Sequence, residues 1–306
     1  MTGLEMLLNG PDPFITDGGI ETDLIFNDGF DLPYFSSFVL LSSEDGRTGL
    51  ERYFDRYLDL AERTGRGFVL DTATWRANAG WAGAHGLSEK DMRSINREAV
   101  RFAHALRARR DWSDRILVNG SIGPAGDGYA PDQLFEPDAA EAIHRPQIEA
   151  LAEAGADLAM ALTMTHPGEA IGVVRAAHAA GLPIAISFTV ETDGQLPVGS
   201  SLADAIAEVE VATNGAPIFY GVNCAHPTHF LDRLDGDWTR RIGVVRANAS
   251  ALSHAELDEA VELDDGDPDD FGRLYGELSA RLPNLHLVGG CCGSDCRHVH
   301  AAMSAL

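Results

Sequence analysis

Lysine is almost absent from this sequence, which contains a single lysine among 306 residues. Lys90 lies in Ser88-Glu89-Lys90-Asp91, a pattern typical of a helix start and remote from any expected strand end. Schiff-base chemistry needs an amine held in the active site, so this position argues against a lysine aldolase or a pyridoxal enzyme. The chemistry of the protein is therefore expected to depend on other side chains.

Positive charge is also scarce, because 47 acidic residues stand against 23 basic ones and the formal net charge is -24. This charge repels phosphate backbones and leaves no basic stripe to follow one, so nucleic acid is not an expected partner. No segment approaches the roughly 18 consecutive apolar residues of a membrane span, so no membrane association is expected. The absence of a hydrophobic signal segment, together with only four cysteines, predicts a cytoplasmic protein.

Short apolar runs alternate with amphipathic stretches along the chain and predict eight strands separated by helices. At this length we expect a (β/α)8 TIM barrel, with a doubly wound open sheet as the main alternative. No linker or low-complexity block divides the chain, so residues 1–306 are expected to form a single domain. The expected strands are residues 14–16, 67–71, 116–119, 157–162, 183–188, 218–222, 241–245 and 285–288.

Polar residues follow these runs at the carboxyl ends of the expected strands, which form the catalytic face of such barrels. Each residue alone is explained by the chain leaving the core, but together they predict a site at this end. They are Asp17, residues 71–74, Ser121, Thr163, Thr189, Asn223, Cys224, Asn248, Cys291 and Cys292.

Three of the four cysteines lie at expected strand ends. Cys291 and Cys292 stand between glycines in residues 289–293, and Cys224 follows an apolar run. Zinc prefers sulfur and nitrogen ligands in a tetrahedron, so these three cysteines predict a zinc site with an open fourth position. Burial in the core is the simpler explanation for one cysteine, but three at strand ends favour a metal. Cys296 is expected on the last helix, as a spare thiol.

An open position on a three-thiolate site suits a thiol substrate. A free thiol has a pKa of about 8.5 and attacks as the thiolate, so binding to zinc would make it nucleophilic at neutral pH. Three cysteine ligands also make the metal a poor Lewis acid for activating water. Alkyl transfer to sulfur is therefore the expected reaction.

The strand-end motifs resemble those of the zinc-dependent homocysteine S-methyltransferases over nearly the whole chain. The combination of Gly221-Val222-Asn223-Cys224 with Gly289-Gly290-Cys291-Cys292 is the specific part of this resemblance. It implies a (β/α)8 barrel with zinc on Cys224, Cys291 and Cys292. The other matching motifs are Asp17-Gly18-Gly19 with Glu21 and Thr22, Thr72-Ala73-Thr74-Trp75, and Gly120-Ser121-Ile122-Gly123-Pro124.

The resemblance also implies roles for single residues. It places Asp17 near the methyl donor, and it indicates Asp17 and Asn223 as catalytic residues. The donor it implies is a small onium compound such as S-methylmethionine, because members that use folate or corrinoid carry additional domains. The substrate-binding residues it implies are Gly18, Gly19, Thr74, Trp75, Ser121 and Thr163. Aromatic faces for a cationic donor are offered by Trp75, Trp81, Tyr129 and Phe188.

One position departs from the family pattern. Members carry a Glu-Thr pair at the end of the fourth strand, where the glutamate holds the amino group of homocysteine. Here Leu162 precedes Thr163, and an apolar side chain cannot bind an ammonium group. Either another acid such as Glu191 takes this role, or the acceptor is a related thiol. Glu169 matches a family glutamate further along the chain.

Other interpretations stay open at this point. A histidine such as His226 or His229 could replace one cysteine as a ligand, and His166 could act as an acid or base. A zinc-dependent demethylase or lyase on the same barrel is one alternative function. A non-enzymatic protein, with zinc closed off by a fourth ligand such as Cys296 or His226, is another. A homo-oligomer is compatible with the sequence.

Overall fold

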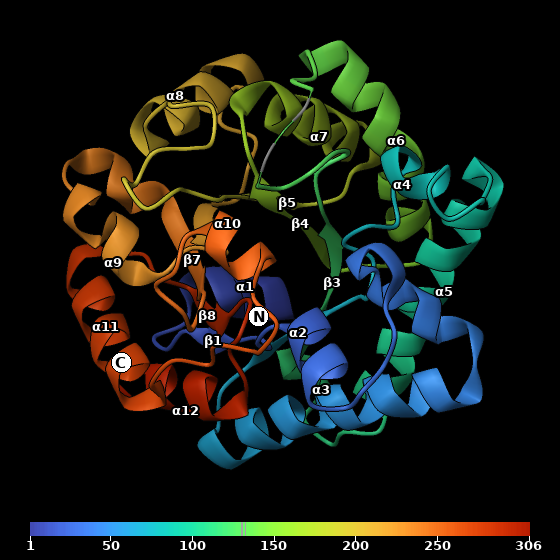
Figure 1. Cartoon of the computed structure of the whole chain (residues 1–306), viewed down its shortest axis with the longest axis horizontal. Helices are drawn as coiled ribbons and strands as arrows, with labels where there is room; N and C mark the ends of the chain where they lie inside the picture. Colours follow the sequence, from blue (N-terminus) through green and yellow to red (C-terminus); the bar gives the residue numbers. More distant parts are fainter. Residues whose placement is uncertain (130, 132) are drawn as a thin grey trace.

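The structure, a computed structural model, describes residues 1–129, 131 and 133–306. Its parallel strands pair in chain order and β1 closes on β8, which confirms the expected (β/α)8 TIM barrel. The helices surround the strands as an outer ring (Figure 1). The strands are β1 (Phe14–Ile15), β2 (Phe68–Asp71), β3 (Ile116–Ile122), β4 (Leu158–Met164), β5 (Ile184–Phe188), β6 (Tyr220–Asn223), β7 (Ile242–Ala247) and β8 (Leu287–Gly290).

The helices begin where the sequence provides caps. Ser43 accepts a hydrogen bond from the backbone N–H of Gly46, and Ser88 forms a capping box with Asp91. The α-helices are α1 (Gly3–Asn9), α2 (Ile20–Phe26), α3 (Glu44–Thr64), α4 (Ala79–Ala82), α5 (Glu89–Arg107), α6 (Pro137–Glu153), α7 (Pro167–Ala180), α8 (Leu202–Thr213), α9 (Pro227–Phe230), α10 (His254–Asp258), α11 (Pro268–Arg281) and α12 (Cys296–Ser304). The 3₁₀ helices are η1 (Pro33–Phe35), η2 (Ser37–Ser42), η3 (Ser113–Arg115), η4 (Leu231–Arg233) and η5 (Asp237–Arg241).

Strands β3 and β4 extend beyond their predicted ends. Ser121 pairs with Met160 within the β3–β4 ladder, although it is polar. Ladder pairing uses backbone groups and does not depend on the polarity of the side chain, so the pattern ended these strands too early. The β4–β5 register shifts between Ala161 and Met164, and Thr163 has a positive φ of 61° there. This irregularity lies at the carboxyl end of β4, where Leu162 and Thr163 line a pocket.

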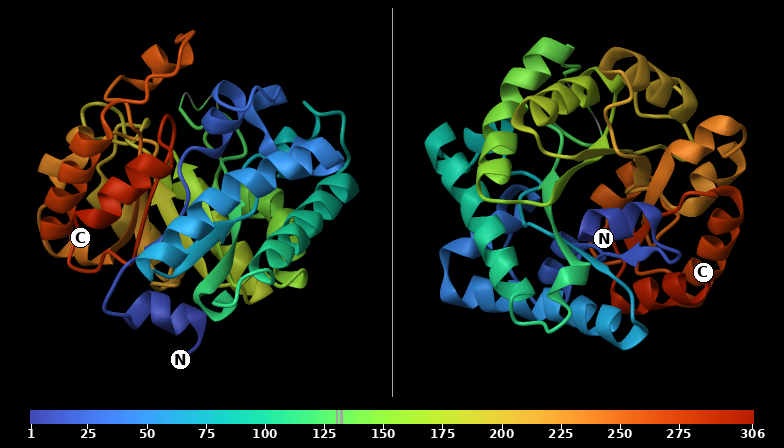
Figure 2. Two further views of the ribbon diagram at one scale, coloured as in Figure 1. Left: turned by 90° about the horizontal axis from the view of Figure 1, so that it is seen from below. Right: turned by 180° about the vertical axis from the view of Figure 1, so that it is seen from behind.

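The amino-terminal end of the barrel is closed by apolar side chains. Helix α1 lies beneath this end of the strands (Figure 2). Its Leu7 belongs to one buried cluster with Phe14, Leu117 and Leu158 from the strands. The opposite, carboxyl-terminal end is thus the end at which polar side chains gather around a pocket.

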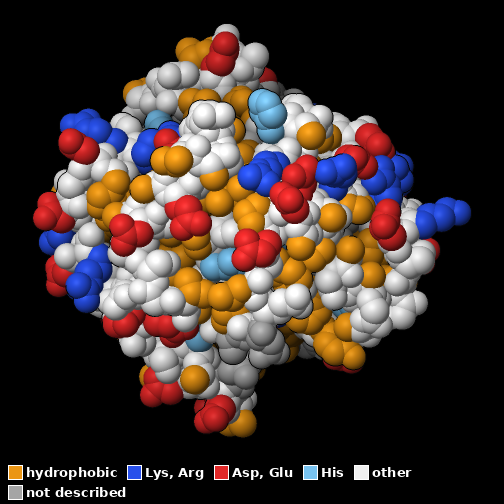
Figure 3. Space-filling model, turned by 90° about the horizontal axis from the view of Figure 1, so that it is seen from above, with side chains coloured by type: hydrophobic (Ala, Val, Ile, Leu, Met, Phe, Trp, Pro, Cys, Tyr) orange, Lys and Arg blue, Asp and Glu red, His pale blue; other side chains and the backbone are white. Residues whose placement is uncertain are grey.

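The surface carries charges of both signs. On the face shown in Figure 3, arginine side chains lie among acidic ones and do not gather in a basic stripe. Within the described part of the chain, no helix combines the length and apolar character needed to cross a membrane.

Candidate metal centre and substrate pocket

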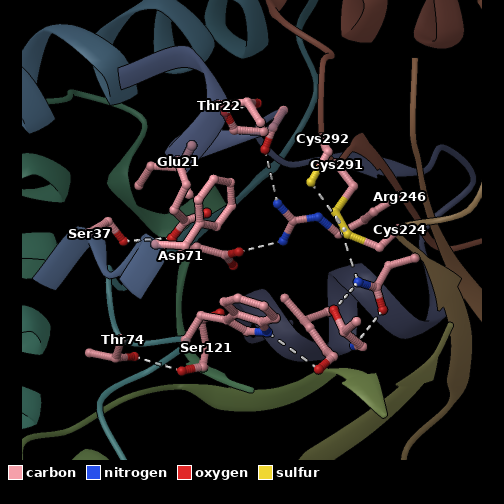
Figure 4. A pocket seen from close by; sticks show the side chains of 18 of the residues that line it. Glu21, Thr22, Ser37, Asp71, Thr74, Ser121, Cys224, Arg246, Cys291 and Cys292 are labelled. Atoms are coloured by element: carbon pink, nitrogen blue, oxygen red, sulfur yellow. Dashed lines mark hydrogen bonds and ion pairs between the residues drawn. A yellow bond between two sulfur atoms is a disulfide. The ribbon is translucent and has the colours of Figure 1, made fainter. Parts of the chain in front are cut away.

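The three predicted ligands meet at the carboxyl end of the barrel. Cys224 directly follows β6, and Cys291 and Cys292 directly follow β8, the two strands that flank β7, and the three side chains meet there (Figure 4). Their sulfur atoms all lie within 4.8 Å of one another. Cys224 and Cys291 are joined by a disulfide, and the sulfur of Cys292 lies 3.8 Å from that of Cys224.

The spacing of these sulfurs suits a metal ion. Tetrahedral zinc with Zn–S bonds of about 2.3 Å holds its sulfur ligands about 3.8 Å apart, which is the separation of Cys224 and Cys292. Reduction of the disulfide frees the sulfurs of both Cys224 and Cys291 to join that of Cys292 as ligands. Among the described residues the ligand group contains no fourth member. His226 instead caps α9, and Cys296 lies at the start of α12, outside the group.

The backbone near the cysteines has an unusual conformation at Cys224 and a close approach at Gly19. Cys224 adopts a positive φ of 54°, which ordinary residues rarely do, while its N–H donates to the carbonyl of Arg246. A Cβ on Gly19 would lie 2.6 Å from the carbonyl oxygen of Cys291 and 2.4 Å from Oγ1 of Thr22. Only glycine at position 19 lets the loop after β1 approach the cysteines so closely.

Asn223 and Thr163 join the ends of β6 and β4. Nδ2 of Asn223 donates to Oγ1 of Thr163 at 2.8 Å, and the backbone N–H of Thr163 donates to Oδ1 of Asn223 at 2.8 Å. Nδ2 of Asn223 also lies 4.0 Å from the sulfur of Cys291. Both predicted residues therefore line the pocket, with the Asn223 amide holding Thr163 in its left-handed conformation.

Asp17, predicted to be catalytic, lies fully buried beneath the pocket. Its carboxylate accepts hydrogen bonds from Arg246 at 2.5 Å and from Tyr53 at 3.0 Å. Burial raises the pKa of Asp17, and the positive charge of Arg246 opposes this shift. Arg246 also pairs with Asp71, which accepts a hydrogen bond from Asn119 at 2.7 Å. Asp17 thus contacts Arg246 and is not among the residues that line the pocket.

Sequence reasoning missed Arg246, although its position offered a signal. A charged residue directly after the apolar run of the seventh strand marks the catalytic face of a barrel. Arg246 is 5% exposed and lines the pocket between two carboxylates, so its charge is compensated by the protein.

The remaining predicted substrate residues, apart from Glu191, lie around one pocket. Nε1 of Trp75 donates to the carbonyl oxygen of Leu162 at 3.4 Å, and Oγ1 of Thr74 donates to the carbonyl of Ser121 at 2.7 Å. The side chain of Leu162 itself forms part of the wall. The lining contains all of the predicted set Gly18, Gly19, Thr74, Trp75, Ser121 and Thr163.

The sequence did not show which of two carboxylates, Glu191 or Glu21, lines the pocket. Glu191 lies 3.0 Å from Nδ1 of His254, whose Nε2 contacts the carbonyl of Cys224, and Glu191 is not among the residues lining the pocket. Glu21 on α2 does line it and accepts a hydrogen bond from Ser37 at 2.7 Å. Burial raises the pKa of Glu21. Glu21 belonged to a recognised motif, but nothing in the sequence showed that it faces the cysteines.

Other polar residues considered from the sequence have structural partners. Glu169 is buried and accepts hydrogen bonds from Nε2 of His144 at 2.8 Å and from the N–H of Ala125 at 2.7 Å. His166 lies between Thr165 and the carbonyl of Phe135. These contacts anchor the segment after β3 and the start of α7.

Tyr129 brings a hydroxyl to the sulfurs. Its Oη lies 3.3 Å from the sulfur of Cys224 and 3.9 Å from that of Cys292, and its ring packs against His254. Burial raises the pKa of Tyr129 well above its ordinary value, so the phenol stays protonated and can donate. Burial also raises the pKa of the Cys292 thiol to about 11. Deprotonation of Cys292 at neutral pH therefore requires a nearby positive charge, which a metal ion provides.

Comparisons with known proteins agree with this arrangement. The family model described as homocysteine S-methyltransferase matches residues 14–306. A homocysteine S-methyltransferase of Escherichia coli K12 is 30% identical over 94% of each chain, and a selenocysteine Se-methyltransferase of Brassica oleracea is 25% identical over 91% of this chain and 84% of its own. The crystal structure of the homocysteine methyltransferase MmuM from Escherichia coli matches over 99% of each chain. Its oxidised form has a TM-score of 0.77 at 26% identity, and its metallated form has 0.76 at 25%.

Proposed function

The chain belongs to the homocysteine S-methyltransferase family, and we propose that it transfers a methyl group from a small onium donor to the thiol of homocysteine or a related acceptor. The observation that carries this proposal is the group of Cys224, Cys291 and Cys292 on the wall of a pocket at the carboxyl end of the barrel. A thiol methyltransferase needs its acceptor sulfur beside such a group.

We infer that zinc is the metal. The three residues that would hold it are Cys224, Cys291 and Cys292, and zinc supplies the positive charge that keeps a bound thiol deprotonated at neutral pH. The metallated form of MmuM supports a metal in this fold. Tyr129 donates toward the sulfurs, and Asn223 holds the backbone on which the pocket wall depends. A site that needs three reduced thiols also suits the predicted cytoplasmic location.

Glu21 is the carboxylate that we assign to the ammonium group of the acceptor. It lines the same pocket as the cysteines, and the described residues include no ion pair to it. Asp71 lines the pocket too, but Arg246 already neutralises it. Burial raises the pKa of Glu21, and the charges of Arg76 and Arg246 oppose this shift without forming an ion pair. An ammonium group in direct contact would compensate the buried carboxylate more fully. Glu21 on α2 thus takes the role that Leu162 on β4 cannot fill.

The test compares two acceptors that differ only in the amine, homocysteine and 4-mercaptobutyrate. We expect Glu21→Gln to raise the KM for homocysteine about 10- to 100-fold, as for a lost hydrogen bond to a charged group, and to leave 4-mercaptobutyrate nearly unchanged. Glu191→Gln is the matched comparison, because it removes the other candidate charge. It should affect both acceptors alike. Selective loss of homocysteine in the Glu191 variant, and not in the Glu21 variant, would reverse the assignment.

A second variant tests whether a carboxylate at the end of β4 can replace that of Glu21. In Glu21→Gln combined with Leu162→Glu, the carboxylate returns to the end of β4, and the KM for homocysteine should fall again. Leu162→Glu in the otherwise unchanged protein should also improve turnover of homocysteine if the native pocket prefers another thiol. Product methionine, measured by mass spectrometry with several onium donors, reports both results. No methylated product from any thiol and donor would defeat the proposed function itself.

The alternatives left open by the sequence have less support. A closed structural site needs a fourth protein ligand, and neither Cys296 nor His226 belongs to the ligand group. A demethylase or lyase would use the same thiol site, and it would consume the donor without forming a methylated thiol.

A further inference from the structure

A second cavity adjoins the substrate pocket on its outer side. It has a volume of about 310 Å³ and shares Thr22, Phe35, Tyr129 and Cys292 with the inner pocket. Its outer wall comes from the loop that includes residues 262–264 and from α10. Two substrates can therefore occupy adjoining spaces, with Tyr129 and Cys292 at their junction.

Arg76, in the loop that follows β2, lines this outer cavity. It is 8% exposed, and its guanidinium carbon lies 3.7 Å from the centre of the Trp81 ring and 4.6 Å from that of Trp75. Stacking on two rings fixes the plane of the guanidinium group without using its N–H donors. The edge of the group therefore remains available for hydrogen bonds.

Two of the three guanidinium nitrogens of Arg76 lack a hydrogen-bond partner among the described residues. Its Nε and Nη1 are buried and have no hydrogen-bond partner among the described residues, which also include no ion pair to it. Burial lowers the pKa of Arg76, while Tyr129, Asp127 and Glu21 oppose that shift. Arg246 shows the contrast, because the protein gives that equally buried guanidinium two carboxylates. Buried donors left without protein partners are rare in folded proteins, and one that lines a cavity is explained by a group bound there, either water or a ligand.

We propose that Arg76 binds a carboxylate of the methyl donor in the outer cavity, so that the donor is an onium compound that also carries a carboxylate. This inference rests on the proposed function. A guanidinium group matches a carboxylate with two parallel hydrogen bonds, which orients the ligand as well as holding it. The acidic side chains of Glu262 and Asp264 on the opposite loop suit the positive onium centre.

The reaction balances with such a donor. The bond from the methyl carbon to the onium sulfur or nitrogen breaks, and its electron pair stays with the leaving sulfide or amine. The acceptor sulfur forms the new bond to the methyl carbon, and the thiol proton is released. Holding the carboxylate at Arg76 places the remainder of the donor in the outer cavity, with its methyl group toward the junction at Cys292.

The test pairs each carboxylate-bearing donor with its methyl ester, which keeps the size and removes the negative charge. The donors are S-methylmethionine, dimethylsulfoniopropionate and glycine betaine, and calorimetry on zinc-loaded protein without acceptor measures their binding. For at least one donor we expect the acid to bind the unmodified protein more tightly than its ester. Arg76→Gln should weaken binding of the acid about 10- to 100-fold and change binding of the ester less than about twofold.

Two controls accompany this measurement. Arg76→Lys keeps the positive charge but loses the paired N–H donors of the guanidinium group. It should therefore bind the acids more tightly than Arg76→Gln and less tightly than the unmodified protein. Arg145→Gln removes an exposed arginine that pairs with Glu141 on the surface of α6, and it should bind every donor normally. Thermal denaturation of each variant shows whether it is folded.

The outcomes separate this inference from the proposed function. Equal binding of acids and esters by the unmodified protein, or equal weakening of both by Arg76→Gln, would overturn the role of Arg76 even if methyl transfer is observed. Selective binding of the acids through Arg76, without turnover of any thiol, would support the carboxylate site and reject the methyl transfer.

Discussion

The two ends of the barrel are built from the same eight strands and differ in what their side chains contact. At the amino-terminal end, Leu7 of α1 packs with Phe14 and Leu117 in a cluster of apolar residues. At the carboxyl-terminal end, the buried Arg246 pairs with Asp17 and lines the same pocket as the cysteine sulfurs. The amino-terminal end gains stability from close packing, while the carboxyl-terminal end holds buried charged side chains and the three cysteines.

This difference shows where the protein carries its chemistry. Apolar burial is non-directional and tolerates modest changes, whereas a buried charge needs a specific partner. Arg246 has two carboxylate partners, whereas neither Arg76 nor Glu21 forms an ion pair with any residue that the structure describes. Substitutions at the carboxyl-terminal end should therefore alter ligand binding more than stability, and substitutions at the other end the reverse.

The largest expected effect is at the cysteines. Cys224→Ala removes one of three metal ligands, and we expect methyl transfer to fall at least about 1000-fold, or ~4 kcal/mol of transition-state stabilisation. The zinc content should fall with it, while the melting temperature of the metal-free proteins stays nearly the same. Zinc analysis, turnover and thermal denaturation check the three parts. Full activity with retained zinc would remove Cys224 from the site.

The apolar end should show the opposite pattern. Leu7→Ala removes a side chain that is 1% exposed, and we expect a loss of about 2–5 kcal/mol in the free energy of unfolding. Both kcat and KM should remain near their normal values at a temperature where the variant is folded. Val211→Ala, at an 83% exposed position, is the control in urea denaturation. A large change in kcat for Leu7→Ala would show that the two ends are not independent.

A buried charge at the functional end should show a pH-dependent effect on stability. Burial raises the pKa of Glu169, but the hydrogen bond and charge of His144 and the N–H of Ala125 bring it below its ordinary value. The stabilising contribution of Glu169 is thus present above its unfolded pKa of about 4.3 and is lost as the pH falls through the lower folded value.

Glu169→Gln should accordingly cost about 1–3 kcal/mol at pH 7, and this difference should shrink in acid. Urea denaturation at several pH values measures it, with the exposed Glu277→Gln as the control for loss of charge. A deficit that stays constant down to the acid transition would mean that the Glu169 carboxylate is not the stabilising group.

The smallest effect is expected at the fourth cysteine. Cys296 lies at the start of α12, where its sulfur donates to the carbonyl of Arg56 at 3.6 Å. Cys296→Ser should leave zinc content and turnover within about twofold of normal, because serine can keep a hydrogen bond there. Loss of zinc in this variant alone would favour a four-thiolate structural site.

The fold was predictable from the sequence because its strands are apolar runs between clear breaks. The sequence pattern placed all eight strands and the helix start at Ser88. It did not predict α1, a helix of seven residues, or the full length of β3 and β4. Short helices and polar strand ends depend on tertiary contacts, which a local pattern does not contain.

The part of the candidate site that local sequence motifs form was predictable. The cysteines and glycines form local motifs, and the structure places them together. Glu21 and Arg76 were not assigned a role, because their significance lies in the cavities that they line and in the absence of an ion pair to either among the described residues. Such relations between distant segments need the fold.

We propose that Cys224, Cys291 and Cys292 hold a metal with one position open for the acceptor thiol. X-ray absorption spectroscopy at the zinc edge counts the sulfur neighbours of the metal directly. We expect three sulfurs and one lighter atom in the zinc-loaded protein, and four sulfurs at about 2.3 Å after homocysteine is added. Four sulfurs before the acceptor is added, or three that persist at saturating homocysteine, would contradict the account.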